Sequence, residues 1–91
     1  MKPQIWNYSF WVQEVDASKL QTQYEQMLVQ CGFTVLNFIE HAFEPQGWTG
    51  LWLLAESHLA IHTFPEHGRS YIGLSSCNQE YYVLFKNKQH A

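Results

Sequence analysis

The side chains best suited to chemistry lie between Ala55 and Gly68. Here polar and ionisable residues interrupt the most apolar part of the chain, whose longest unbroken apolar run is 51–55. Ser57 offers a hydroxyl, and His58 and His62 offer imidazoles, which accept and release protons near neutral pH. These groups could serve metal binding, hydrolysis or acid–base chemistry.

A zinc site is the first possibility, because His58 and His62 are four residues apart. On a helix this spacing would bring both imidazoles to one turn. The intervening residues, 59–61, are apolar and favour a strand, in which four residues span about 13 Å. Zinc holds imidazole nitrogens at about 2 Å, so we expect no metal here.

A serine hydrolase is the second possibility, since Ser57 adjoins His58. Neighbouring residues of a strand point to opposite faces, and the G-x-S-x-G motif of the nucleophile elbow is absent. A third possibility is that these are polar groups at a strand edge without chemistry. Each residue taken singly fits that interpretation, but the joint pattern argues against it.

The elements that must position these residues can be read from hydrophobic periodicity. Segments rich in branched and aromatic residues predict strands at 5–15, 33–43, 48–56, 58–63 and 70–77, with a last short strand at 81–86. A turn is expected at 44–47 and a loop at 64–68.

One helix is expected between the first two strands. Asp16 and Ser18 are both suitable N-caps, and Gly32 is a natural C-cap. Apolar residues at intervals of three and four form its buried stripe: Leu20, Tyr24, Met27, Leu28 and Cys31. The predicted fold class is α+β, an antiparallel sheet with a helix packed on one face.

The composition of the chain limits the kinds of partner and the cellular location that we expect. The 91 residues suffice for one domain, and 46% of them are hydrophobic. The net charge is −3 and the five basic residues form no run, so a nucleic-acid partner is not expected. No apolar stretch approaches the roughly 20 residues that cross a bilayer, and residues 1–4 do not resemble a signal peptide. With only two cysteines, Cys31 and Cys77, we expect free thiols and a cytoplasmic location.

The run from Phe43 to Gly68, with Cys77 downstream, resembles the small prokaryotic form of S-adenosylmethionine decarboxylase. That family carries Glu-Ser-His at the end of a strand, two aliphatic residues, Ile-His-Thr, an aromatic residue, Pro-Glu and Gly. The matching residues are Glu56, Ser57, His58, Ile61, His62, Thr63, Phe64, Pro65, Glu66 and Gly68. A Phe, a Pro-x-Gly turn and a Ser/Thr-Gly pair precede them in the family, and here these are Phe43, Pro45, Gly47, Thr49 and Gly50.

The resemblance implies a proenzyme that cuts its own backbone between Glu56 and Ser57, giving a β chain 1–56 and an α chain 57–91. The Ser57 hydroxyl would attack the Glu56 carbonyl and leave a pyruvoyl group at the head of the second chain. No metal and no pyridoxal phosphate is then expected. His62 matches the processing histidine and Thr49 a hydroxyl residue that assists it. Since Thr49 and Ser57 are both odd-numbered, a regular strand would put them on one face.

The resemblance also implies the remaining roles. The pyruvoyl ketone would form a Schiff base with the substrate amine and act as an electron sink. Cys77, twenty residues beyond Ser57 as in the family, matches the proton donor; thiols keep their proton near neutral pH, unlike carboxylic acids. Phe43 matches a ring that stacks on adenine, and Glu66 a carboxylate that holds the ribose hydroxyls. The implied activity is decarboxylation of S-adenosylmethionine, which supplies the aminopropyl donor for spermidine synthesis.

The chain departs from the family at Asn7, where a histidine is usual, at Phe64, commonly a tryptophan, and at Asn78, commonly a glycine. Only fourteen residues follow Cys77, where the family has a second helix and a final strand. We therefore expect a C-terminally short member in which part of the sheet lacks its covering helix. Three alternatives stay open: the uncovered face makes a homodimer of cleaved protomers, the substrate is ornithine or arginine, or the chain is an uncleaved binding partner of an active paralogue.

Overall fold

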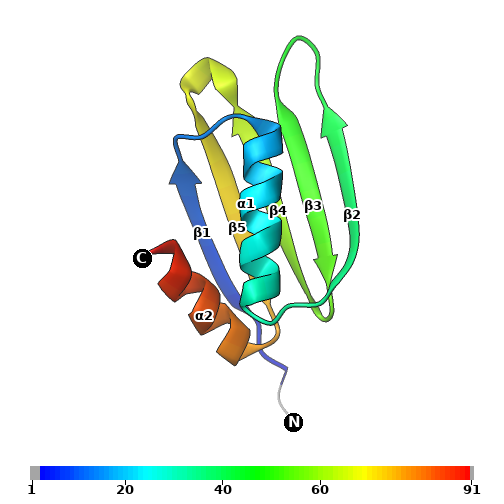
Figure 1. Ribbon diagram of the computed structural model, residues 1–91, viewed down its shortest axis with the longest axis vertical. Coiled ribbons are helices and arrows are strands. Elements are labelled where there is room, and N and C mark those ends of the chain that lie inside the picture. Colours follow the sequence, from blue (N-terminus) through cyan, green and yellow to red (C-terminus); the bar gives the residue numbers. More distant parts are fainter. Residues whose placement is uncertain (1–2, 91) are drawn as a thin grey trace.

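The computed structural model describes residues 3–90 and shows within them a five-stranded antiparallel sheet and two helices (Figure 1). The strands are β1 (Trp6–Val12), β2 (Val35–Ala42), β3 (Trp48–Leu54), β4 (Ser57–Phe64) and β5 (Arg69–Ser76). The helices are α1 (Ala17–Gln30) and α2 (Gln79–Gln89), and a short 3-10 helix, η1 (Pro65–His67), joins β4 to β5. The strand order is β1-β5-β4-β3-β2, so β4 lies at the centre of the sheet. The predicted α+β class is confirmed.

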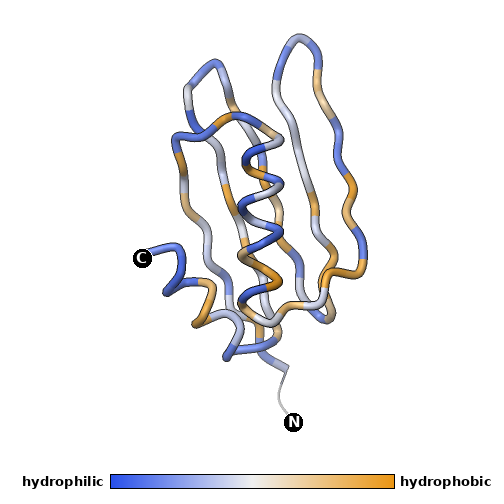
Figure 2. The backbone as a smooth tube through the Cα atoms, viewed as in Figure 1, coloured by the Kyte–Doolittle hydropathy of each residue, from blue (hydrophilic) through white to orange (hydrophobic). Residues whose placement is uncertain are grey.

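Helix α1 lies across one face of the sheet (Figure 1). Asp16 is its N-cap and accepts a hydrogen bond from the Lys19 amide at 3.1 Å. The C-cap is Cys31 rather than the predicted Gly32, which follows it with a φ of 104°. Hydrophobic and hydrophilic residues alternate along it (Figure 2). Leu20, Tyr24 and Leu28 of the predicted stripe are buried, which confirms that this side of the helix faces the core.

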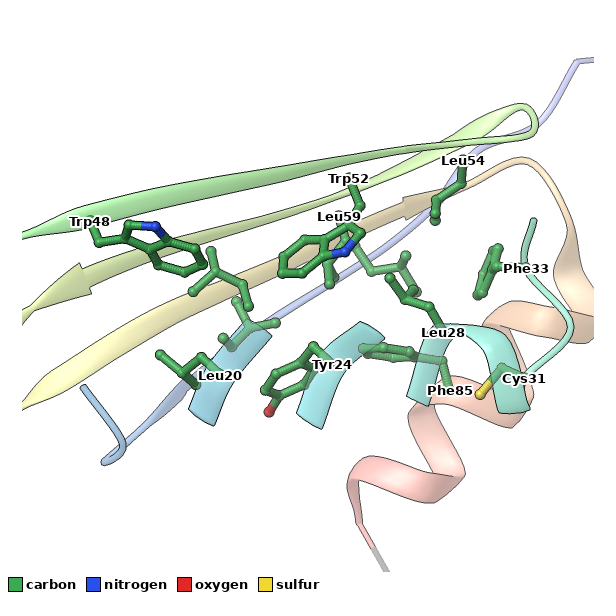
Figure 3. Close-up of a cluster of buried hydrophobic side chains, with 13 residues drawn as sticks. Leu20, Tyr24, Leu28, Cys31, Phe33, Trp48, Trp52, Leu54, Leu59 and Phe85 are labelled. Carbon is green, nitrogen blue, oxygen red and sulfur yellow. The ribbon is translucent and has the colours of Figure 1, made fainter. Parts of the chain in front are cut away.

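The core fills the space between the sheet and the helices (Figure 3). Trp52 is the largest of its fully buried side chains, followed by Tyr24 and Phe85. Cys31 also belongs to this cluster, as predicted, and burial raises the pKa of its thiol. Cys31 is therefore a packing residue.

The two faces of the sheet differ sharply, because side chains alternate along each strand. On β4 the odd-numbered residues from Ser57 to Thr63 are buried against the helices, whereas the even-numbered ones from His58 to Phe64 are exposed or half-buried. We call the side without helices the open face. Its side chains on the central strands are those of Thr49, Leu51, Leu53, His58, Ala60, His62, Tyr71, Gly73 and Ser75.

The C-terminal segment departs from prediction. Residues 81–86, predicted as a short strand, lie within α2, so the expectation that this part of the sheet lacks a second helix is also wrong. Asn78 caps α2 by accepting a hydrogen bond from the Tyr81 amide at 2.9 Å, and Phe85 is fully buried in the core. The aromatic residues that favour strands are here used at helical spacing.

Other element boundaries shift by a few residues. β1 ends at Val12 rather than continuing to Val15, and the register of β2 shifts between Val35 and Asn37. None of the helices described for residues 3–90 has the length and apolar character needed to span a membrane.

Truncating Phe85 tests the docking of α2. We expect Phe85→Ala to lower the free energy of unfolding by about 3–5 kcal/mol, because it removes a fully buried ring. The matched control is Val83→Ala on the exposed side of α2, which should change stability by less than about 0.5 kcal/mol. Urea denaturation followed by circular dichroism gives both values. Equal stability of the two variants would contradict the docked helix.

Candidate active site

The Glu56–Ser57 bond lies in the tightest turn of the sheet. Leu54 of β3 pairs with Ser57 of β4, so only Ala55 and Glu56 connect the two strands. Glu56 is the single non-glycine residue in the range 3–90 with a positive φ, at 60°. This left-handed conformation costs an L-residue roughly 1–2 kcal/mol, and strain of this kind is often stored at functional sites.

The Ser57 side chain is held on the covered face of the sheet. It is only 7% exposed, and its Oγ accepts a hydrogen bond from the Cys77 backbone amide at 3.1 Å. The pairing of Ser57 with Ser76 across β4 and β5 makes this contact possible between residues twenty apart in the sequence. The serine and cysteine singled out from the sequence are therefore brought together.

Ser76 is a residue of this site that sequence reasoning missed. Its Oγ lies 3.5 Å from Ser57 Oγ, accepts from the Asn78 amide at 3.0 Å and donates to the Asn78 carbonyl at 2.8 Å. These bonds fix the bend between β5 and α2 in which Cys77 lies exposed. The place of Ser76 in this site follows only from the pairing of β5 with β4, which the sequence alone does not show.

Thr49 and His62 form a second polar group, on the open face. They pair across β3 and β4, and Thr49 Oγ1 lies 2.9 Å from His62 Nδ1. A hydrogen bond at Nδ1 orients the ring and leaves Nε2 for proton transfer. The predicted partnership of these two residues has direct geometric support.

The predicted substrate-binding residues join this second group. Phe43, Thr49, His62 and Glu66 all line one cavity of about 290 Å³. The β2–β3 loop supplies Phe43 and η1 supplies Glu66, and both segments lie at the same end of the sheet (Figure 1). The cavity thus combines an aromatic face, a carboxylate, a hydroxyl and an imidazole.

The two groups lie apart within one chain. Ser57 and His62 are five positions apart on β4, which corresponds to roughly 16 Å along a strand. The side chains also point to opposite faces, because Ser57 is odd-numbered and His62 even-numbered. The expectation that Thr49 shares a face with Ser57 is wrong: the hairpin register places Thr49 beside His62 instead.

Further residues extend the row that contains Thr49 and His62. Successive register pairs run across the open face in the order His41, Thr49, His62, Tyr71 and Trp11. The ring of His41 also meets that of Phe43 edge-on, with 4.6 Å between centroids. Sequence reasoning missed His41 and Tyr71, since no local motif marks a neighbour across strands.

Metal ligands are not assembled in the described part of the chain: in 3–90 no three His, Cys, Asp or Glu side chains form a group that could hold an ion. The prediction that His58 and His62 lie on a strand is confirmed.

These features define a two-layer α+β protein with a serine hydroxyl bonded to the backbone of a cysteine at one end of its sheet and an imidazole in a cavity at the other. Residues 13–86 match the family model described as S-adenosylmethionine decarboxylase. The chain therefore belongs to the S-adenosylmethionine decarboxylase family, as the motif around Ser57 predicted.

Individual relatives agree with this assignment. An S-adenosylmethionine decarboxylase proenzyme of Prochlorococcus marinus is 48% identical over 65 residues, covering 71% of this chain and 52% of that protein. The proenzyme of Methanococcus vannielii is 41% identical over 73 residues, covering 76% and 60% respectively. The crystal structure of the adenosylmethionine decarboxylase from Aquifex aeolicus superposes with a TM-score of 0.75 at 26% identity, over 96% of this chain and 78% of that one. The chain spans about half the length of the curated relatives that it matches most strongly.

Relieving the turn tests the strain at Glu56. In a Ser57→Ala background, which lacks the nucleophile, we expect Glu56→Gly to raise the free energy of unfolding by roughly 0.5–1 kcal/mol, because glycine adopts positive φ without a Cβ clash. Ala55→Gly is the matched control and should lower stability, since glycine gains only unfolded-state freedom there. Urea denaturation compares them. If Glu56→Gly destabilises as much as Ala55→Gly, the turn is unstrained.

Proposed function

We propose that this chain is a self-processing proenzyme that cleaves between Glu56 and Ser57 and, as a pyruvoyl enzyme, decarboxylates S-adenosylmethionine. The observation that carries the proposal is the buried Ser57 hydroxyl, which directly follows the strained turn residue Glu56 and accepts a hydrogen bond from the Cys77 amide. Membership of the family and the proenzyme names of the relatives support it. The product would serve as an aminopropyl donor for spermidine synthesis.

The cleavage chemistry uses residues already in the turn. The Ser57 oxygen adds to the Glu56 carbonyl carbon, the carbon–nitrogen bond breaks, and an ester with a free amine results. Loss of the residue-57 α-proton then expels the Glu56 carboxylate, and water replaces the nitrogen, releasing ammonia. Because the reacting atoms belong to adjacent residues, their positioning can lower the activation free energy by about 7–11 kcal/mol. Leaving the left-handed conformation of Glu56 adds to the driving force.

The residues around position 57 suit both the cleavage and the resulting group. The Cys77 amide donates to Ser57 Oγ and so holds the nucleophile in place before cleavage; that oxygen then leaves with Glu56, and the ketone forms at the residue-57 Cα. A pyruvoyl group there supplies a ketone for the substrate amine and an electron sink for the bond to the carboxylate. Cys77 itself is exposed beside the site and is our proposed proton donor to the substrate carbon. That role requires a reduced thiol, consistent with work in a reducing cytoplasm.

The cavity at the other end offers groups suited to the nucleoside part of S-adenosylmethionine. Phe43, 48% exposed, offers its ring to adenine and to the sulfonium charge. Glu66 offers acceptor oxygens to the ribose hydroxyls. These two residues favour a nucleoside substrate over plain ornithine or arginine.

The complete site requires two copies of the chain. His62 and the nucleoside cavity lie on the open face at one end of the sheet, and Ser57 and Cys77 lie at the other end. An antiparallel homodimer that stacks two open faces would bring each end against the opposite end of its partner. The open face suits such a contact, because exposed Ile39, Leu51 and Leu53 form an apolar area on it.

Intact-mass analysis of freshly purified protein tests self-cleavage. We expect one chain of 56 residues and one of 35 with a blocked N-terminus, because cleavage follows Glu56. Ser57→Ala should yield one uncut chain, since the nucleophile is gone. Uncut wild-type protein would refute the proposed function.

Co-expression of two inactive variants tests the shared site. Ser57→Ala and His62→Ala should each stay uncut alone. In a mixed dimer the Ser57 of the His62→Ala chain meets the His62 of the Ser57→Ala chain, so the His62→Ala chain should be cleaved. If equal amounts of the two variants pair at random, about half of the His62→Ala chains are in mixed dimers and should be cut. Different affinity tags identify each chain by mass. If the mixture is no more cleaved than either variant alone, His62 does not act across the dimer.

A further inference from the structure

The charge on the open face is unlike that of the whole chain. The protein carries eight acidic residues and a net charge of −3. Yet the five strands described within 3–90 present no carboxylate on the open face; their ionisable side chains there, other than Tyr71, are His41, His58, His62 and Arg69, and the nearby Glu66 of η1 lines the separate cavity around His62. The part of this face around His58 has hydrogen-bond donors and no carboxylate, which favours an anionic group.

This face is hollowed beside the cleavage site. A cavity of about 260 Å³ lies over β4, β5 and β1, with the side chains of Ser9, His58, Tyr71 and Ser75 in its lining. Its floor is formed by the small residues of one row across the strands: Ala60, Gly73 and Ser9.

Gly73 keeps this hollow in shape. A Cβ there would lie 3.0 Å from a ring carbon and 3.3 Å from the hydroxyl oxygen of Tyr71. The Tyr71 ring therefore leans over Gly73 and carries its hydroxyl into the hollow. A larger residue at position 73 would displace it.

Hydrogen-bond donors surround the floor. His58 lies in the next row, paired with Ser75, whose hydroxyl donates to Asn7 Oδ1. The Asn7 amide nitrogen, the His58 ring and the Tyr71 hydroxyl can all donate to a ligand. His58 is moreover bonded directly to residue 57, so the hollow lies beside the backbone of residue 57, on the face opposite to the Ser57 side chain.

We propose that this hollow, with His58 as its main donor, binds the carboxylate of the amino-acid end of the substrate. The inference rests on the proposed function, and it adds a subsite for the group that is lost. The carboxylate is attached to the same carbon as the reacting amine, so its subsite has to adjoin residue 57. Leu53 flanks His58 on its other side and limits hydration of a bound carboxylate.

The proposed role of His58 is selection and orientation of the substrate. Its contact is made with the ground-state carboxylate and weakens as carbon dioxide forms. Loss of His58 should therefore raise KM far more than it lowers kcat. Self-cleavage involves no substrate and should continue.

A matched pair of ligands tests the subsite. S-Adenosylmethionine and its decarboxylated form share the nucleoside, sulfonium and amine and differ in the carboxylate. Calorimetry on the uncleaved Ser57→Ala protein, which cannot turn over substrate, gives the affinity of each. We expect Ser57→Ala/His58→Ala to lose roughly 10-fold or more in affinity for S-adenosylmethionine, as for a hydrogen bond to a charged group, with little change for the decarboxylated form. Asn37→Ala, in the same row of the open face but outside the hollow, is the control and should change neither.

The outcomes separate the two proposals. Uncut wild-type protein defeats the proposed function, whereas cleaved protein whose carboxylate preference survives His58→Ala defeats only this inference. Equal losses for both ligands also overturn it, because they indicate general damage to the site. If the uncleaved protein binds neither ligand, kinetics of the cleaved His58→Ala protein decide the question. The KM for S-adenosylmethionine and the inhibition constant of the decarboxylated form are each compared with those of the wild type. If the ratio of the two constants is the same in both proteins, the inference is overturned.

Discussion

The register of β4 between β3 and β5 is the constraint on which the arrangement of this protein depends. Pairing with β5 places Ser57 opposite Ser76 and hence its hydroxyl beside the Cys77 amide. Pairing with β3 places His62 opposite Thr49. Since side chains alternate, the same strand presents its serine to the core and its histidine to the open face. A slip of one residue would reverse both and destroy either site.

Two tryptophans of β3 help to fix the register of this strand, because each ring packs in the core and its indole N–H donates a hydrogen bond to a glutamate at the edge of the core. Trp52 Nε1 donates to Glu25 of α1 at 3.1 Å, and Trp48 Nε1 donates to Glu40 of β2 at 2.8 Å. The Trp48 ring covers Gly50 so closely that a Cβ there would lie 2.5 Å from it. The neighbouring residues Thr49 and Gly50 thus act on opposite faces of the sheet. Thr49 orients His62 on the open face, and the missing side chain of Gly50 leaves room for the Trp48 ring on the covered face.

Much of the fold could be predicted, because each successful prediction rested on local physics. Alternation and turn residues located the five strands, and the stripe ending at Cys31 located α1. The failures depended on tertiary context. Residues 81–86 have strand propensity, but Phe85 is buried only if they form a helix capped by Asn78. The residues around Ser57 and those of the nucleoside cavity could be named from their motif, whereas their separation at two ends of the sheet required the hairpin register.

That separation gives the open face its two roles in the proposed enzyme. Its apolar residues on β2 and β3, with Leu51 and Leu53 among them, would bury against a second copy. Its hollow over β4, β5 and β1 is floored by Ala60 and Gly73, which are so small that two stacked sheets would not close on it. In the proposed dimer the two features would depend on one another: the stacked apolar residues would exclude water from a cavity that the small residues preserve. In the proposed dimer a substrate held there would meet a site that neither chain contains alone, so assembly would be a condition for both processing and catalysis.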